Sequence, residues 1–250
     1  MERWQSKVAV VTGASAGIGA AIAKDFIAAG LIVVGLARRQ HAIEEFRNQF
    51  TAEQQNRLHA IKCDVSQLES VNEAFDWIEK NLGGIDILVN SAGFFQPGQL
   101  CTMDVQLIQN VLQTHVMGAL YCTQRAFKSM KERQFDGHVI LINSIYGTRV
   151  GMYVPPNMPN HNMNTAAKHA LTAINEILRQ EFHALGTKVK VTSISPGAVD
   201  TDILSEVARN MLKDCMLKTE DISQCVLFAI STPPHVQIHE MIVKPIGEML

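Results

Sequence analysis

The sequence lacks a long uninterrupted run of apolar residues. No stretch of the 250 residues approaches the roughly 18 apolar positions of a membrane-spanning helix. The segment Met1–Lys7 carries charges where a signal peptide requires an apolar core. Internal repeats and linkers rich in serine, glycine and proline are also missing. We therefore expect a soluble, cytoplasmic protein without a membrane span, built as one domain over residues 1–250.

An excess of charge and a set of paired cysteines are missing too. The 22 basic and 24 acidic residues give a formal net charge of −2, which provides no basic surface for nucleic acid or an anionic membrane. The five cysteines are an odd number and contain no C-x-x-C pair, so a disulfide framework or a zinc site is not expected. We expect buried, reduced thiols, no metal and no nucleic-acid partner.

Short β-branched runs alternate with amphipathic segments along the whole chain, in which 47% of the residues are hydrophobic. This alternation predicts the α/β class, with a parallel sheet, right-handed crossovers and helices on both faces. We expect a single doubly wound domain of the Rossmann type. The periodicities predict strands at 8–11, 31–34, 58–62, 86–90, 138–143, 189–194 and 236–243, and helices at 17–29, 41–54, 68–82, 104–131, 163–185 and 221–230.

A glycine-rich turn, Thr12-Gly-Ala-Ser-Ala-Gly-Ile-Gly19, follows the first expected strand. Its glycine spacing differs from the common G-x-G-x-x-G pattern. Glycines let a backbone approach a ligand, and the first amides of the next helix offer unpaired N–H donors and a positive dipole end. The turn is therefore either a tight connection or a pyrophosphate site built by Gly13, Ser15, Gly17, Ile18 and Gly19.

The ends of the next two strands carry residues that could distinguish between cofactors. An acidic residue after the second strand would bind the ribose 2′-hydroxyl of NAD, whereas a cation there matches the 2′-phosphate of NADP. Arg38 and Arg39 favour NADP(H), unless they only form a solvated corner. Asp64, after the third strand, could bind the adenine amino group or could cap the helix that begins near Gln67.

Several motifs, in their order and spacing, resemble the short-chain dehydrogenase/reductase family. They are Thr12–Gly19, Cys63-Asp-Val65, Asn90-Ser-Ala-Gly93, Ser144 with Lys168, and Ser195-Pro-Gly197. The beginning Met1-Glu-Arg-Trp-Gln5, the stretch Leu36-Ala-Arg-Arg39 and the ending 233–245 resemble, within that family, the insect farnesol dehydrogenase-like enzymes and their mammalian relatives.

This resemblance implies a sheet of seven strands, NADP(H) as cofactor, and the oxidation or reduction of an alcohol or carbonyl compound. It also implies homodimers or homotetramers formed through two long helices, which the apolar surfaces of 104–131 and 163–185 permit. The cofactor contacts that it implies beyond the glycine turn and the two arginines are Asp64, Val65, Asn90, Ala92, Gly93, Lys168, Pro196, Gly197, Val199 and Thr201.

The same resemblance assigns the catalytic roles. Ser144 would polarise the substrate oxygen, and Lys168 would bind the nicotinamide ribose. The catalytic tyrosine of the family stands four residues before the lysine, where this chain has Asn164. An asparagine amide can polarise a carbonyl but cannot deliver a proton at neutral pH. The chain is therefore either an oxidoreductase with another proton source, or a cofactor-binding relative that has lost catalysis and acts as a ligand binder or regulator.

Four other side chains are candidate proton carriers. His115 stands where the family usually has an asparagine that holds a water of the proton relay. It either takes over this role, since histidine titrates in the useful range, or is a hydrogen-bonded helix residue without a role. Tyr146, Tyr153 and His161 lie between Ser144 and Lys168, but neither tyrosine can share a helical face with the lysine.

Apolar side chains also recur at helical spacing between Ile203 and Leu217. This stripe is either a substrate lid near 201–217 or ordinary core packing. Phe94, Phe95 and Met152 favour an apolar pocket, so the expected partner is an apolar alcohol or carbonyl compound.

Overall fold

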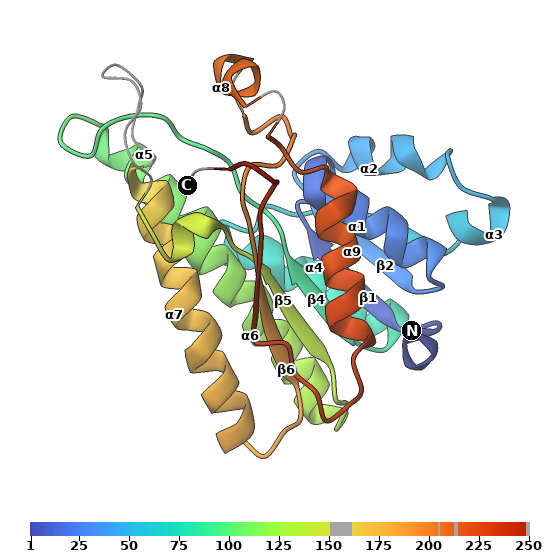
Figure 1. Cartoon of the computed structure of the whole chain (residues 1–250). Helices are drawn as coiled ribbons and strands as arrows, with labels where there is room; N and C mark the ends of the chain where they lie inside the picture. The colour runs from blue at the N-terminus through green and yellow to red at the C-terminus, as the bar shows by residue number, and fades with distance from the viewer. Residues whose placement is uncertain (151–161, 205, 213–214, 249–250) are drawn as a thin grey trace.

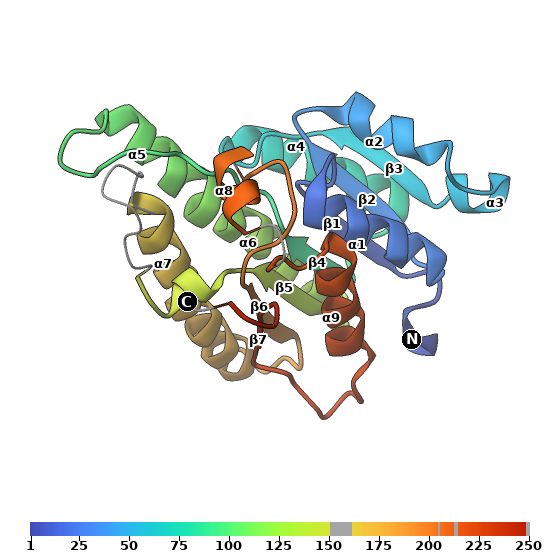
Figure 2. The same cartoon turned by 45° about the horizontal axis from the view of Figure 1, so that its top comes forward.

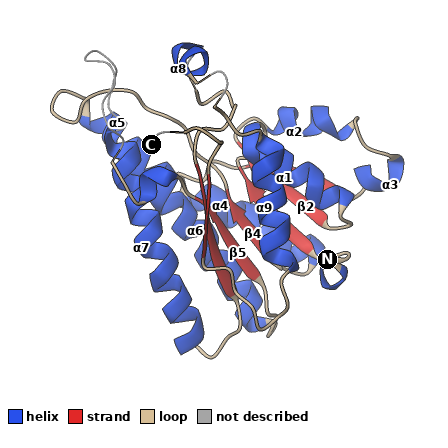
Figure 3. Ribbon diagram, in the orientation of Figure 1, coloured by secondary structure: helices blue, strands red, loops and turns tan. Residues whose placement is uncertain are grey.

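The computed structural model describes residues 1–150, 162–204, 206–212 and 215–248. Its centre is a seven-stranded sheet in the order β3-β2-β1-β4-β5-β6-β7, and each neighbouring pair is parallel (Figure 1). The chain first moves outward from β1 to β3 and then returns to the other side of β1. Helices cover both faces (Figure 3), so the predicted doubly wound α/β fold is confirmed.

The strands are short, and those at the centre of the sheet are entirely buried. Parallel strands with helices on both faces require such continuous apolar runs. Their bounds are β1 (Val8–Thr12), β2 (Ile32–Ala37), β3 (Leu58–Lys62), β4 (Ile87–Asn90), β5 (His138–Ile142), β6 (Lys190–Pro196) and β7 (Glu240–Val243). Strand β7 is shorter than the predicted 236–243.

Figure 2 shows helices on both faces of the sheet, and an apolar core lies between the sheet and the helices on each face. Helices α1 and α9 pack on one face, where Phe26 and Val226 join Val11 of β1. Helices α4, α6 and α7 pack on the other face, together with Val10 of the same strand. The helices are α1 (Gly17–Ala28), α2 (Gln40–Arg47), α3 (Ala52–Gln55), α4 (Leu68–Leu82), α5 (Val105–Leu112), α6 (Gly118–Glu132), α7 (Asn162–Ala184), α8 (Glu206–Met211) and α9 (Thr219–Ser231).

One helix prediction is wrong, because the expected helix at 41–54 is divided, and another is confirmed with an irregular turn inside it. The segment 41–54 forms α2 and α3, since Thr51 starts a new helix through a reciprocal capping pair with Gln54. The predicted helix at 104–131 is confirmed: α5 and α6 form one continuous helix with a π-helical turn at Gln113–Met117 between them. No glycine or proline marks that turn in the sequence, and it contains His115.

The structure bears on two further expectations, buried thiols and the absence of a membrane-spanning helix. Cys63 and Cys122 are buried, but Cys101 is exposed, so the prediction of buried thiols is wrong for Cys101. None of the helices in the described ranges is long and apolar enough to cross a membrane.

Asp86 ties together β1, β4 and α6 at the amino end of the sheet. Its carboxylate accepts hydrogen bonds from the Val8 N–H at 2.8 Å and from the Arg133 guanidinium at 2.9 Å. Arg133 also donates to the carbonyl of Ile85. Because Asp86 is 4% exposed, its removal would leave a buried N–H and a partly buried cation without partners.

We expect Asp86→Ala to lower the free energy of unfolding by about 2–3 kcal/mol, which urea denaturation measures. Asp76→Ala is the matched control, since Asp76 pairs with Arg125 on the surface, and we expect an effect below about 1 kcal/mol. Equal effects of the two substitutions would contradict the structural role of Asp86.

Candidate active site

The predicted site residues follow the carboxyl ends of neighbouring strands. This edge, the upper one in Figure 1, is where open α/β sheets bind ligands, at the point where the strand order reverses. The residues lie at 13–19 after β1, 38–39 after β2, 64–65 after β3, 90–93 at the end of β4, 144 after β5 and 196–201 at the end of β6.

The glycine turn is both a tight connection and a suitable anion site. Gly13 and Gly17 have φ values of +68° and +56°, which favour glycine. A Cβ at Gly13 would lie 2.8 Å from the Cα of Ala92, and one at Gly19 would lie 2.5 Å from the Gly13 oxygen. Helix α1 begins after Ala16 without a side-chain cap. Its first N–H groups therefore suit a phosphate group such as the pyrophosphate of a dinucleotide.

Arg38 and Arg39 follow β2 as two exposed cations. Neither guanidinium forms a hydrogen bond or an ion pair with the part of the chain that the structure describes. Their charges suit the 2′-phosphate of NADP. The donor set at this edge thus fits a phosphorylated dinucleotide.

Asp64 does not cap the following helix, so that alternative is wrong. Its carboxylate accepts from the backbone N–H of Ser66 at 3.0 Å and from the Ser66 hydroxyl at 2.6 Å. Helix α4 begins after Gln67 and has no side-chain cap. Asp64 thus stabilises the turn that precedes α4.

Lys168 connects α7 to the end of β5. Its Nζ donates to the carbonyl oxygen of Ile142 at 2.8 Å, two residues before Ser144. Burial lowers the pKa of Lys168 to about 8. The lysine is therefore an ammonium ion at neutral pH, held beside the strand end that carries Ser144.

Ser144 begins the short helical turn η3 (Ile145–Gly147). Its Oγ accepts from the backbone N–H of Tyr146 at 3.2 Å. Its hydroxyl hydrogen has no acceptor within the described residues, so it is available to polarise a carbonyl oxygen.

Asn164 is 9% exposed, and its carboxamide is fully used by its surroundings. The Nδ2 group donates to the Gln96 carbonyl and to the Asn162 side chain, both at 2.9 Å. The Oδ1 atom accepts from the Gln96 N–H at 3.5 Å. An Asn164 amide in this arrangement has no free hydrogen for a substrate oxygen.

His115 is buried in the π-helical turn η2 (Gln113–Met117), and its Nε2 lies 2.9 Å from the Phe94 carbonyl oxygen. Burial, and then the charge of Lys168, lower the pKa of His115 to about 3, although the hydrogen bond to Phe94 offsets part of this shift. The imidazole is therefore neutral at physiological pH, which favours a hydrogen-bonded helix residue over a titrating relay. Its Nδ1 has no partner in the described residues.

A small internal cavity adjoins these groups. It measures about 10 Å³, close to the volume needed for one water molecule. Thr12, Asn90, His115 and Lys168 contribute polar side chains to its lining. The cavity is lined by candidate site residues and is too small for a substrate.

The other candidate proton carriers gain no support. Tyr146 lies in the turn after β5, as expected. Burial, and then the charge of Glu248, raise the pKa of Tyr146, which makes its phenol a weaker acid. Tyr153 and His161 lie outside the described residues, as does Met152 of the expected apolar pocket.

Of the two alternatives for 203–217, core packing does not hold for two residues. Ile203 is 51% exposed and Met211 is 56% exposed, and the short helix α8 stands above the sheet edge (Figure 1). The segment is anchored at its base, where the N–H of Leu217 donates to the carbonyl of Ala198 at 2.8 Å. The described residues between 201 and 217 therefore form a loop with one short helix that leaves the sheet after β6 and returns to it at Leu217.

Sequence reasoning missed three residues around the site. Asn162 and Gln96 hold the Asn164 carboxamide, and the close spacing of two asparagines before a helix was the available signal. Glu248 accepts from the Ala198 N–H at 3.2 Å, and a side chain at Gly197 would collide with it. Nothing in the local sequence indicates this contact, because 50 residues separate its partners.

Comparisons with known proteins agree with this architecture. A family model described as short chain dehydrogenase matches residues 7–212. A farnesol dehydrogenase from Aedes aegypti is 48% identical over 99% of both chains. The dehydrogenase/reductase SDR family member 11 from Mus musculus is 37% identical over 98% of this chain and 96% of its own.

A solved structure extends the likeness to three dimensions. The closed form of serine dehydrogenase complexed with NADP+ superimposes with a TM-score of 0.85 at 27% identity, over 97% of this chain and 96% of that one. The parallel sheet, the site at its carboxyl edge and the relatives all agree. The chain belongs to the short-chain dehydrogenase family of NAD(P)-dependent oxidoreductases.

Proposed function

We propose that this protein is an NADP(H)-dependent oxidoreductase that slowly interconverts an apolar alcohol, such as farnesol, and its aldehyde or ketone. The observation that carries the proposal is the hydrogen bond from Lys168 to the Ile142 carbonyl, which holds the ammonium group at the end of β5, two residues before Ser144. The 48% identity to a farnesol dehydrogenase supports the same reaction class. Phe94 and Phe95, which follow β4, support an apolar substrate.

Each group has a physical task in this mechanism. The first amides of α1 bind the pyrophosphate, Arg38 and Arg39 bind the 2′-phosphate, and Lys168 binds the ribose. When bound, the cofactor supplies or accepts the hydride. The Ser144 hydroxyl donates a hydrogen bond to the substrate oxygen as negative charge develops there. Asn164 supplies no proton, so the proton must come from water or from Tyr153 or His161, which lie outside the described residues, and we expect slow turnover.

A second candidate function is an NADP(H)-binding relative that has lost turnover and acts as a ligand binder or regulator. The observation that favours it is the engagement of Asn164 by Gln96 and Asn162. Under either function, the exposed apolar side chains Val105 and Ile177, on α5 and α7, support our proposal of a homodimer or homotetramer.

The double substitution Arg38→Ala and Arg39→Ala tests the cofactor. We expect the dissociation constant of NADPH to rise at least tenfold, and that of NADH to change less than about twofold, because only NADPH carries the 2′-phosphate. Fluorescence titration measures both constants, and Lys128→Ala, an exposed change on α6, serves as the control. A parallel loss of both affinities would contradict the proposed NADP preference.

The pH dependence of NADPH binding tests Lys168. Its ammonium is present below the pKa of about 8 and is lost as the pH rises through that value. We therefore expect NADPH affinity to fall between pH 7 and about pH 9.5 in the parent. In Lys168→Arg the affinity should stay level over this range, since a guanidinium keeps its charge. An equal decline in both proteins would show that another group is responsible.

Asn164→Tyr tests the missing proton donor, which acts as the base that accepts the hydroxyl proton when an alcohol is oxidised. We expect turnover of farnesol with NADP+ at saturating substrate to rise about 100-fold, the lower end of the usual contribution of general acid–base catalysis. Asn164→Phe adds the same bulk without a hydroxyl and should give no rise.

Three results would change the proposal. Brisk turnover by the parent, with no gain in Asn164→Tyr, would contradict impaired catalysis. NADPH binding without any measurable turnover by the parent would favour the second candidate function. No NADPH binding would contradict both.

A further inference from the structure

The segment 93–98, which follows β4 at the ligand-binding edge, is held from two sides. On the first side, the His115 ring lies beneath it. The Nε2 atom is 2.9 Å from the Phe94 oxygen and 3.3 Å from the Phe94 nitrogen, so either tautomer binds this peptide unit. A Cβ at Gly93 would lie 2.8 Å from the ring, which explains why the backbone needs glycine here.

On the second side, the beginning of α7 holds the same segment with two carboxamides. Asn164 forms hydrogen bonds to both backbone groups of Gln96, as donor to its oxygen at 2.9 Å and acceptor from its N–H at 3.5 Å. Asn162, which has a φ of +38°, donates to the oxygens of Gln96 and Gly98, both at 2.9 Å. Neither alanine nor aspartate could reproduce these donors.

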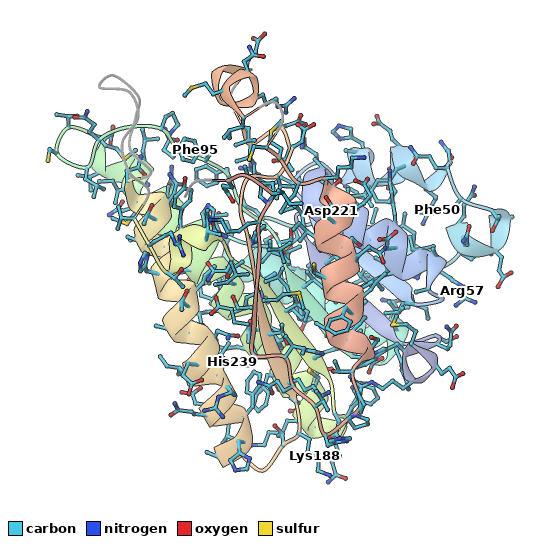
Figure 4. All side chains as sticks on the ribbon, in the orientation of Figure 1. Phe50, Arg57, Phe95, Lys188, Asp221 and His239 are labelled. Atoms are coloured by element: carbon cyan, nitrogen blue, oxygen red, sulfur yellow. The ribbon has the colours of Figure 1, made fainter. Side chains whose placement is uncertain are left out.

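The two residues that depart from the family pattern, His115 and Asn164, therefore act on one short stretch of backbone. This stretch carries Phe94 and Phe95. Figure 4 labels Phe95 on the loop that passes over the beginning of α7. The Phe94 ring also packs on the His115 ring, with centroids 5.5 Å apart. A wall whose backbone is already fixed loses little conformational entropy when a ligand binds against it.

We propose that His115, Asn162 and Asn164 are positioning residues that fix the 93–98 segment. Its two phenylalanines then form an aromatic wall for an apolar ligand with a long chain, such as an isoprenoid alcohol. This inference rests on the proposed function and deepens it. The residues at the two altered positions do not transfer protons in this account. They hold the substrate-binding wall in place, so that ligand affinity depends on them while cofactor affinity does not.

The test measures farnesol binding to the NADPH complex by calorimetry, because an alcohol and a reduced cofactor cannot react. Asn162→Ala and Asn164→Ala should each raise the farnesol dissociation constant about tenfold, while the NADPH constant changes less than about twofold. His115→Ala should also weaken farnesol binding, and the double variant His115→Ala/Asn164→Ala should weaken it by less than the product of the two single effects, since both residues hold one segment. Asn175→Ala is the matched control. Asn175 is a buried amide of α7 that donates to the His239 carbonyl, away from the segment.

Amide hydrogen exchange gives a readout that general destabilisation would not move. The Gln96 amide should exchange at least about tenfold faster in Asn164→Ala, and at the parental rate in Asn175→Ala. Unchanged farnesol affinity in all three positioning variants, or the same loss in Asn175→Ala, would overturn the inference. NADPH binding by the parent without farnesol binding would also overturn it, whereas absence of NADPH binding would overturn the proposed function itself.

Discussion

The hydrogen bond from Lys168 to the Ile142 carbonyl joins the longest helix to the end of a central strand, and the candidate site depends on it. Removing an ammonium group from water is unfavourable unless acceptors replace its hydration. Here a backbone oxygen does so, and the remaining ammonium hydrogens stay available for a ribose. The lowered pKa of Lys168 is the consequence of that burial.

Hydride transfer and proton transfer have different requirements in this fold. A hydride donor needs only a cofactor fixed at the right distance, which the glycine turn, the two arginines and Lys168 can provide. Protonation of the developing alkoxide needs an acid within hydrogen-bond reach. The side chain nearest to that role by sequence, Asn164, forms a two-way pair with the Gln96 peptide instead. In our proposals, slow turnover and a fixed binding wall both follow from the presence of an asparagine at position 164.

Much of this architecture can be predicted from the sequence, because strand runs such as 8–11 and helices such as 68–82 have clear periodicity and fixed ends. The glycine turn and Ser144 can also be predicted, because each is recognised from neighbouring residues in the sequence. The π-helical turn around His115 has no such signal, since it contains neither proline nor glycine. The hydrogen bond from Asn164 to Gln96 could not be predicted from the sequence either, because 68 residues separate the two. Glu248 near Gly197 is a third contact that only tertiary packing creates.

Our central proposal is that this protein binds its cofactor and polarises a substrate oxygen, but that no acid among the residues described by the structure is positioned to protonate that oxygen. A crystal structure of the parent with NADPH and farnesol tests this most directly. We predict the Ser144 Oγ about 3 Å from the farnesol oxygen, with the Asn164 amide still paired to Gln96 and no tyrosine, histidine or carboxyl group within hydrogen-bond reach of that oxygen. A side chain able to donate a proton at that distance would contradict the claim.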